Sequence, residues 1–387
     1  MVKSAVINYE SSIVVKSKLN PKLIYDYINR QKPCHDHIKK LYNSEGVETT
    51  NKSTIANILN KQFVQVFNPL NDRPIKSLEI IDLEHIGSTD LNIFSELNVL
   101  KYINQLNENK SIGPDGLHPL IIKRCSGTFA TVLSRIFTRS FETGIVPDSW
   151  KKANITPIFK KGNRPDPANY RPISLTPVPC KLMEKIIRNE MIDHLTINNL
   201  ITPEQHGFVT GKSCLTNLLE TVDIITDTID SGYRLLIVFL DFAKAFDKVC
   251  HRSLLAKLKS YRFDSRIVVW VENFLNNRFQ RVILGDAISN WEKVTSGVPQ
   301  GSCLAPLLFV IFINDMPRVV KHLLKLFADD SKLIGIIKND NDLTSFQEDV
   351  DALTLWATDW QMLFHPDKCK LMEVSKKKIH QIINKPL

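Results

Sequence analysis

The sequence has no cysteine pair with metal-site spacing and no pattern of a disulfide-stapled protein. Its seven cysteines are scattered, odd in number and free of any C-x2-C spacing. They predict buried or free thiols in a reducing compartment rather than a disulfide framework or a zinc site. A local group of metal-ligating residues, Cys34, His35, Asp36 and His37, has no second half, which argues against a metal there.

The sequence also lacks the segments that direct a chain into a membrane. Its first residues have no signal-peptide hydrophobic region, and its longest apolar run, 304–313, is about half a membrane span and contains Pro306. We therefore expect no membrane partner and an intracellular location, nuclear or cytoplasmic. Internal repeats and low-complexity tracts are absent as well.

What is present is an ordinary globular composition with an excess of positive charge. The 387 residues are 43% hydrophobic and 24% charged, enough for two or three lobes around a sizeable core. The formal net charge is +9, which points to a polyanionic partner, nucleic acid before a membrane surface. That signal is weak on its own, because many basic proteins bind neither.

Two adjacent acids, Asp329 and Asp330, interrupt an apolar stretch and are the most informative feature of the chain. Neighbouring carboxylates repel, so a fold keeps them together where water or a divalent cation offsets the repulsion. The simpler interpretation is the polar tip of a hairpin, and the alternative is a metal site. A third carboxylate within reach would favour the metal site.

The order of elements from residue 235 onward supplies that third carboxylate. A buried strand at 235–240 ends at Asp241, strands are expected at 323–328 and 332–337, and a last one near 369–374. Strand, helix, strand, strand, helix, strand is the split βαβ pattern, in which the first two strands are parallel and the third lies antiparallel beside the first.

This arrangement brings Asp241 beside Asp329 and Asp330 at one edge of the sheet. Such a site suits two hard cations for in-line phosphoryl transfer, Mg²⁺ first and Mn²⁺ as the alternative. A basic segment, 152–171, would then face a triphosphate or a phosphate backbone, although a solvated basic loop has the same composition.

Helical spacing of apolar residues predicts most of the remaining elements. Helices are expected at 55–67, 97–106, 129–141, 180–198, 252–260, 265–276, 303–314 and 343–360, and a hairpin at 279–284 and 291–298. Ser213 is expected to cap a further helix. Its apolar residues share one face, the pattern of a helix packed on a core: Leu215, Leu218, Val222, Ile225 and Ile229.

Five segments resemble, in order, the successive motifs of reverse transcriptases, and the first two look like those of jockey-like non-LTR retrotransposons. They are 110–116 (KSIGPDG), 169–175 (NYRPISL), 239–247 (FLDFAKAFD), 296–302 (SGVPQGS) and 327–330 (FADD). The resemblance covers about 109–374. It implies an α+β fold, the fingers and palm of a right-hand polymerase, with the palm a split βαβ antiparallel sheet packed on helices.

The resemblance also implies roles for single residues. Asp241 and Asp329 would be the main metal ligands, with Asp330 assisting and the backbone carbonyl of Phe242 as a further ligand. Other positions correspond to the nucleotide site: Lys160 and Arg171 at the triphosphate, Phe246 under the sugar, and Gln300 and Gly301 along nucleotide and template. Glycine allows close backbone approach there.

Some of these assignments have a structural alternative. Phe246 also fits an ordinary core aromatic. Lys368 resembles the lysine proposed to protonate pyrophosphate, and a surface lysine fits equally well. Asp247 lies beyond the strand end and has the more structural interpretation.

By this resemblance the chain has four parts. A polar, mostly helical segment of unknown role covers 1–90, an N-terminal extension and fingers cover 91–234, the palm covers 235–375, and a basic tail covers 376–387. The endonuclease usual in this branch, the primer-grip hairpin and the thumb are expected to be missing.

The expected activity is RNA-directed DNA polymerisation, with an RNA template, a DNA primer and dNTPs as partners. A domesticated or decayed protein that binds nucleic acid without polymerising is the alternative. A group II intron maturase is a weaker one, because no maturase-type extension is present.

Overall fold

The molecule is built around two five-stranded sheets, and each sheet joins strands that lie far apart in the sequence. The computed structural model describes residues 2–18, 20–24, 27, 38–69, 78–83, 88–376 and 380–383. The segment 34–37, considered above for metal binding, lies outside the described residues.

The C-terminal sheet contains the strands that end in acids. Its order is β12-β11-β5-β10-β9, and every neighbouring pair is antiparallel. The bounds are β5 Arg234–Asp241, β9 Leu323–Phe327, β10 Asp330–Ile337, β11 Lys370–Val374 and β12 His380–Ile383. Because β10 separates β5 from β9, those two strands are parallel. The predicted split βαβ arrangement is confirmed.

One strand of this sheet was not predicted. β12 pairs with β11 as a hairpin beyond the last strand predicted from the sequence, within the segment expected to be a basic tail. This strand is hard to predict because it has only four residues. The lysines just before His380 also suggest a solvent-exposed segment. The segment expected to be a basic tail therefore contains a strand.

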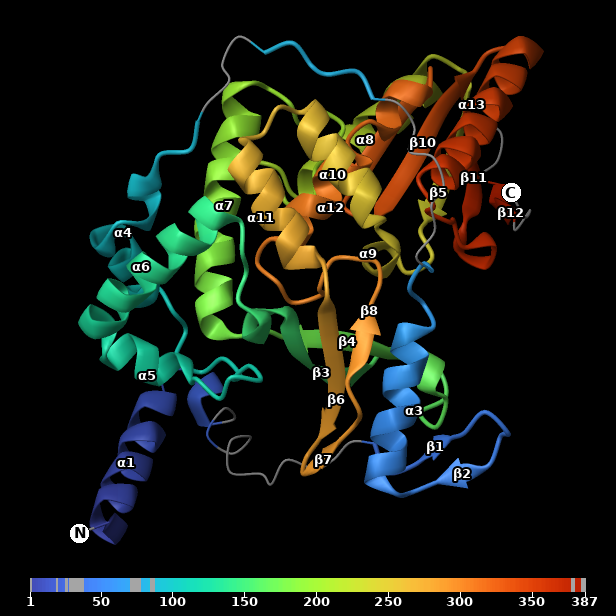
Figure 1. The fold of residues 1–387 in the computed structure, drawn as a ribbon. Coiled ribbons are helices and arrows are strands. Elements are labelled where there is room, and N and C mark those ends of the chain that lie inside the picture. Colours follow the sequence, from blue (N-terminus) through green and yellow to red (C-terminus); the bar gives the residue numbers. More distant parts are fainter. Residues whose placement is uncertain are drawn as a thin grey trace.

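The second sheet, here called the mixed sheet, joins two separate stretches of chain. Its order is β4-β3-β6-β7, with β8 also paired to β6. The bounds are β3 Lys152–Phe159, β4 Tyr170–Leu175, β6 Arg278–Leu284, β7 Ala287–Ile288 and β8 Glu292–Val294. β3 and β4 form an antiparallel hairpin, and β6 adds to β3 in parallel. The predicted hairpin at 279–298 therefore completes a sheet begun far upstream (Figure 1).

Helices surround both sheets. Their bounds are α1 Val2–Ser17, α3 Lys52–Val64, α4 Glu96–Asn104, α5 Pro119–Arg124, α6 Ser126–Thr143, α7 Val178–Ile197, α8 Cys214–Asp230, α9 Ala245–Lys248, α10 His251–Ser260, α11 Ser265–Leu275, α12 Ala305–Ile313 and α13 Asp340–Asp359. Short 3-10 turns lie at Leu91–Phe94, Asp148–Lys151, Pro167–Asn169, Met316–Val319 and Pro366–Lys368, and β1 Leu41–Tyr42 pairs with β2 Glu48–Thr49.

Local sequence explains where several helices begin and end. α6 ends at Gly144, whose φ of 67° is the left-handed value that glycine adopts readily. α8 begins with a capping box, in which the Ser213 side chain accepts from the Thr216 N–H and the Thr216 side chain accepts from the Ser213 N–H. The predictions of the α6 end and the α8 cap are confirmed.

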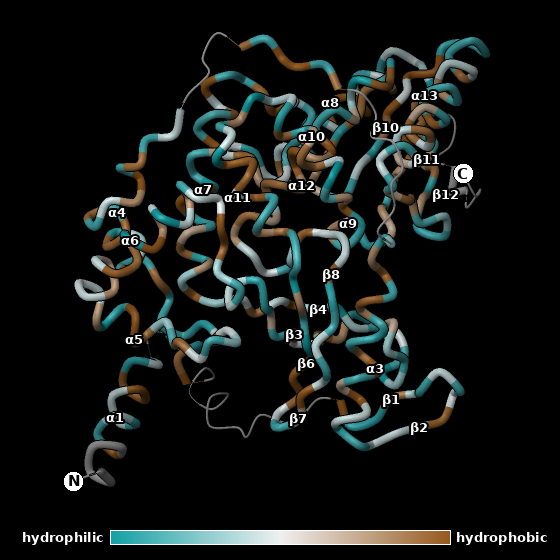
Figure 2. Tube along the Cα trace, in the orientation of Figure 1, coloured by the Kyte–Doolittle hydropathy of each residue, from teal (hydrophilic) through white to brown (hydrophobic). Residues whose placement is uncertain are grey.

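The main core lies between the C-terminal sheet and the central helices. α12 is apolar on all sides and sits in this core, whereas hydrophobic and hydrophilic residues alternate along the outer helices (Figure 2). Alternate residues of β5 serve opposite faces: Leu236 and Val238 pack in the main core, and Leu235 and Ile237 pack against α8. β5 is thus covered on both sides by helices.

The packed face of α8 differs from the prediction. Leu215, Leu218 and Val222 are exposed, and only the C-terminal part of the predicted face, with Ile225 and Ile229, packs on the sheet. The buried residues of α8 are Asn217, Thr221 and Thr228. Helical spacing identifies residues that share a face, but it does not say which face meets the sheet.

The structure also bears on membrane insertion. Across the described residues, no helix combines the length and apolar character needed to cross a bilayer.

Candidate active site

Three carboxylates lie at one edge of the C-terminal sheet. Asp241 is the last residue of β5, and its Cα is paired in register with that of Asp330, the first residue of β10. Asp329 lies in the two-residue turn between β9 and β10, next to Ala328, whose φ is 54°. The acid pair is therefore the tip of a hairpin, and it lies beside the third acid.

The charges of this site interact. Partial burial raises the pKa of Asp330, and the negative charges of Asp329 and Asp241 raise it further. The cations Lys160 and Lys368 act in the opposite direction. Three acids and two lysines from four separate segments of the chain thus share one electrostatic environment.

Lys368 is paired directly with the first acid. Its Nζ donates to Asp241 Oδ1 at 3.0 Å, and both side chains are about one-third exposed. Lys368 comes from the 3-10 turn that precedes β11. Lys368 therefore lies beside the acids at this edge of the sheet.

The backbone around Phe242 is fixed by the same segment. His365 N donates to Asp241 O at 2.8 Å, and Ala243 N donates to Leu363 O at 2.7 Å. The Phe242 side chain is buried and stacks on Phe364, with ring centroids 4.6 Å apart. These contacts hold the Phe242 peptide beside the Asp241 carboxylate.

The β3–β4 hairpin brings basic side chains to the acids. Lys160 follows β3, and its N–H donates to Asn169 O at 2.9 Å, while Arg171 lies on β4. Burial lowers the pKa of Lys160, the cations Arg171 and Lys368 lower it further, and the Asp241 carboxylate raises it. Lys160 therefore shares the electrostatic environment of Asp241 and Lys368, and Arg171 lies close enough to Lys160 to lower its pKa.

The loop before α12 packs closely against β4 and is hydrogen-bonded to it. Ser174 N donates to Gln300 O at 2.7 Å, and Gly301 has a φ of 118°. A Cβ at Gly301 would lie 2.5 Å from the Ser174 carbonyl oxygen. Glycine does allow a close backbone approach here, and the backbone that approaches belongs to β4.

Asp247 positions Gln300 and does not belong to the group of acids. Gln300 Nε2 donates to Asp247 Oδ1 at 2.9 Å and to Oδ2 at 3.0 Å. Burial raises the pKa of Asp247 to about 6 although the hydrogen bond from Gln300 lowers it. The structural interpretation of Asp247 agrees with this geometry.

Phe246, next to it, is half-buried and stacks on Phe309 with ring centroids 4.7 Å apart.

A buried acid that the sequence analysis did not single out supports the same loop. Glu184, on α7, is fully buried and accepts from Cys303 N at 2.8 Å, from Leu304 N at 3.3 Å and from the Ser302 hydroxyl. It fixes the chain directly after Gly301 at the start of α12. In the sequence Glu184 looks like an ordinary polar position of a helix, so no local signal marks it.

The residues present suit a hard divalent cation in their chemistry. Carboxylate and carbonyl oxygens are the ligands that Mg²⁺ and Mn²⁺ prefer, and Asp241, Asp329, Asp330 and the Phe242 carbonyl supply them. Within the described ranges, however, no three His, Cys, Asp or Glu side chains converge as a ready-made metal site. Asp241 is paired with Lys368 instead, so a cation would compete with an ammonium group for this carboxylate.

Comparison with known proteins identifies the family. The sequence profile described as "Reverse transcriptase (RNA-dependent DNA polymerase)" matches residues 158–381, more than half of the chain. The chain belongs to the reverse transcriptase family. The matched segment of this reverse transcriptase domain contains every site residue predicted above, from Lys160 to Lys368.

Relatives from mobile elements agree with this assignment. The chain is 30% identical over 320 residues to the RNA-directed DNA polymerase from mobile element jockey of Drosophila melanogaster, covering 79% of this chain and 35% of that protein. It is 29% identical over 280 residues to a probable RNA-directed DNA polymerase from transposon BS of the same species, covering 70% of this chain and 31% of the relative. The predicted likeness to jockey-like elements is confirmed.

More distant similarity extends to another element of the fly. A Pol polyprotein from the type-2 retrotransposable element R2DM is 26% identical over 244 residues, covering 62% of this chain and 22% of that protein. The chain spans about a third of the length of the jockey and BS relatives that it matches.

Proposed function

We propose that this chain is an RNA-directed DNA polymerase that adds dNTPs to the 3′-hydroxyl of a DNA primer on an RNA template. The observation that carries the proposal is the register pairing of Asp241 with Asp330, beside Asp329 in the hairpin turn, in a chain of the reverse transcriptase family. The relatives from jockey and transposon BS bear the name of this activity.

In this proposal the C-terminal sheet is the palm and the mixed sheet belongs to the fingers of a right-hand polymerase. The split βαβ order of β5, β9 and β10 supports the palm assignment. The β3–β4 hairpin, from which the charge of Lys160 acts on Asp241 and Asp330, supports the fingers assignment.

Two Mg²⁺ ions, with Mn²⁺ as an alternative, would be held by Asp241, Asp329, Asp330 and the Phe242 carbonyl. Cations bound there would supply activation of the attacking hydroxyl and stabilisation of the leaving oxygens. The chain's own contribution is to hold carboxylates from two strand ends at one sheet edge and to neutralise part of their repulsion with Lys160 and Lys368.

The remaining residues bind and orient the nucleotide. Lys160 and Arg171 offer cationic donors to the triphosphate from the β3–β4 hairpin. Phe246 packs under the sugar, and Gln300 and Gly301 line the nucleotide and template site. Lys368, whose Nζ donates to Asp241 Oδ1 at 3.0 Å, would act as the general acid that donates a proton to the leaving pyrophosphate.

Primer extension on an RNA template with dNTPs and Mg²⁺ tests the proposal. The double variant Asp329→Ala/Asp330→Ala is expected to lose extension by at least about a thousandfold, because the charges that hold the metals are gone. Asp223→Ala/Asp227→Ala removes two exposed acids of α8 and is the matched control, expected to keep wild-type extension.

Two results would contradict the proposal. Extension that survives the Asp329→Ala/Asp330→Ala change would remove these residues from the metal site. A wild-type chain that binds RNA in a salt-dependent way but extends no primer would favour the nucleic-acid-binding alternative.

A further inference from the structure

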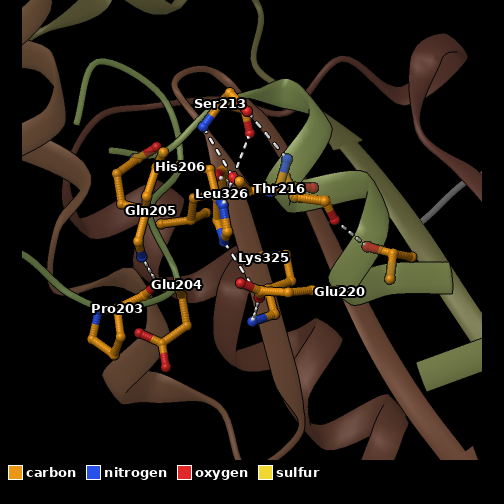
Figure 3. Close-up of polar contacts among 12 residues, drawn as sticks. Pro203, Glu204, Gln205, His206, Ser213, Thr216, Glu220, Lys325 and Leu326 are labelled. Atoms are coloured by element: carbon orange, nitrogen blue, oxygen red, sulfur yellow. Dashed lines mark hydrogen bonds and ion pairs between the residues drawn. The ribbon is translucent and has the colours of Figure 1, made fainter. Parts of the chain in front are cut away.

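A loop far from the motifs lies against the turn that carries Asp329. Residues 203–207 connect the region after α7 to α8, and they run beside the end of β9 (Figure 3). Leu326 N donates to Glu204 O at 2.9 Å, and His206 N donates to Leu326 O at 2.9 Å. Gln205 and Leu326 form a parallel bridge, so the loop extends the sheet by one short edge segment.

The side chain of Gln205 reaches the turn itself. It is fully buried, and its Oε1 accepts from Gly207 N at 2.7 Å and from Ala328 N at 3.1 Å. A Cβ at Gly207 would lie 2.3 Å from Ala328 N, so only glycine lets the loop come this close. The contact is therefore built by both the loop backbone and the glutamine amide.

Ala328 is the residue that needs such support. Its φ of 54° is a left-handed conformation that residues with a Cβ adopt only when their surroundings hold them there. Asp329 follows directly, so the direction of its carboxylate depends on the Ala328 peptide. Release of the Ala328 N–H would let this turn relax and move Asp329 relative to Asp241.

The loop is anchored on its other side by α8. His206 Nδ1 lies 2.9 Å from Thr216 Oγ1, and the Glu220 carboxylate lies 3.4 Å from His206 Nε2 and 2.5 Å from Lys325 Nζ. Asn217 Nδ2 donates to the Leu326 carbonyl at 3.2 Å. These contacts tie the loop to both α8 and β9, and Figure 3 shows His206, Thr216, Glu220 and Lys325 among them.

We propose that Gln205 is a positioning residue of the active site, which fixes the left-handed Ala328 peptide and thereby the metal-binding direction of Asp329. Its relevance to polymerisation depends on the function proposed above. The position of the turn does not, and it can be measured without substrate.

The test compares Gln205→Met, which has similar length and no acceptor oxygen, with Gln205→Glu, whose carboxylate still accepts both N–H groups. The control is Asn60→Leu, because Asn60 is equally buried and its amide bonds to Asn290 O and Gln280, away from the acids. Three quantities are measured: hydrogen exchange of the Ala328 amide, Mn²⁺ binding by electron paramagnetic resonance, and the Mg²⁺ concentration for half-maximal extension.

For Gln205→Met we expect exchange at Ala328 to be about tenfold faster and metal binding about tenfold weaker, the size of one lost buried hydrogen bond. Gln205→Glu should restore slow exchange, and Asn60→Leu should lower the melting temperature without changing exchange at Ala328 or metal binding. This split separates positioning from a general loss of stability.

Wild-type exchange and metal binding in folded Gln205→Met would overturn the proposal, as would equal effects of Asn60→Leu. A wild-type chain without extension would overturn the polymerase proposal instead, and the exchange and Mn²⁺ measurements would still decide the role of Gln205.

Discussion

Asp247 is a residue whose acidity the fold changes strongly. Its side chain is 8% exposed, and burial raises its pKa to about 6 against an ordinary value of 3.8. The folded chain therefore binds this proton more tightly than the unfolded chain. The contribution of this carboxyl to the free energy of unfolding is largest below pH 4, falls by roughly 3 kcal/mol as the pH rises toward 6, and is constant above that.

Asp247→Asn should remove this contribution, because asparagine keeps an acceptor for Gln300 and has no charge. The unfolding free energy of the variant, measured by urea titration at pH 4.5 and pH 7.5, is expected to fall less between these values than that of the wild type. Asp223→Asn, on the exposed face of α8, is the control with unchanged pH dependence. Parallel curves for wild type and Asp247→Asn would refute the pKa assignment.

Gly301 and Gly211 distinguish two destabilising effects of replacing glycine by alanine, the strain of a positive φ and a steric clash of the new Cβ. Both have positive φ, but a Cβ at Gly211 meets nothing within 4 Å, whereas one at Gly301 meets the Ser174 carbonyl at 2.5 Å. Gly211→Ala should lower the free energy of unfolding by about 1 kcal/mol through backbone strain alone. Gly301→Ala should cost more than about 3 kcal/mol, because β4 must also move. Equal losses in urea unfolding would show that the loop can shift away from β4.

At the level of elements, the strands and the acids were predictable because the signal is local. The apolar run before Asp241 and the pair of runs around Asp329 have strand length, and their order alone sets the split βαβ topology. The supports of the site were not predictable, because their partners lie far apart in sequence. Gln205 and Ala328 are separated by 123 residues, and Glu184 and Cys303 by 119.

α8 shows the limit of helical spacing. Its N-terminal half turns a polar face to the sheet. There the Asn217 side chain donates to the Leu326 carbonyl, and the Asn217 backbone carbonyl accepts from Lys332 Nζ at 3.4 Å. Buried carbonyl and ammonium groups require such polar partners. The apolar residues of this half consequently face outward, which the sequence pattern could not reveal.

Two alanine substitutions on α8 test this orientation. Leu218→Ala should change the free energy of unfolding by less than about 0.5 kcal/mol, because the side chain is exposed and alanine suits a helix. Ile225→Ala should cost about 2 kcal/mol, because Ile225 packs against the sheet. Urea unfolding of both variants measures the difference, and a larger loss for Leu218→Ala would mean that α8 is rotated about its axis.

At the scale of the whole molecule, the proposed active site lies between two cores of unequal size. The main core unites the C-terminal sheet with α4, α6, α7 and α10–α13, whereas a small separate core lies between α3 and the mixed sheet. Asp241 lies on the C-terminal sheet of the main core. Lys160 follows β3 and Arg171 lies on β4, in the mixed sheet of the smaller core. The packing of the smaller core is the less extensive of the two.

The unequal cores predict unequal local stability. Amides of β3 and β6 should exchange through a partial opening whose free energy is at least about 2 kcal/mol below that of β5 and β10. Native-state hydrogen exchange at increasing denaturant measures both. Leu59→Ala, in the buried face of α3, should speed exchange in the mixed sheet and leave β5 and β10 unchanged, because Leu59 belongs to the smaller core. A single exchange free energy for both sheets, lowered equally by Leu59→Ala, would show one cooperative unit instead.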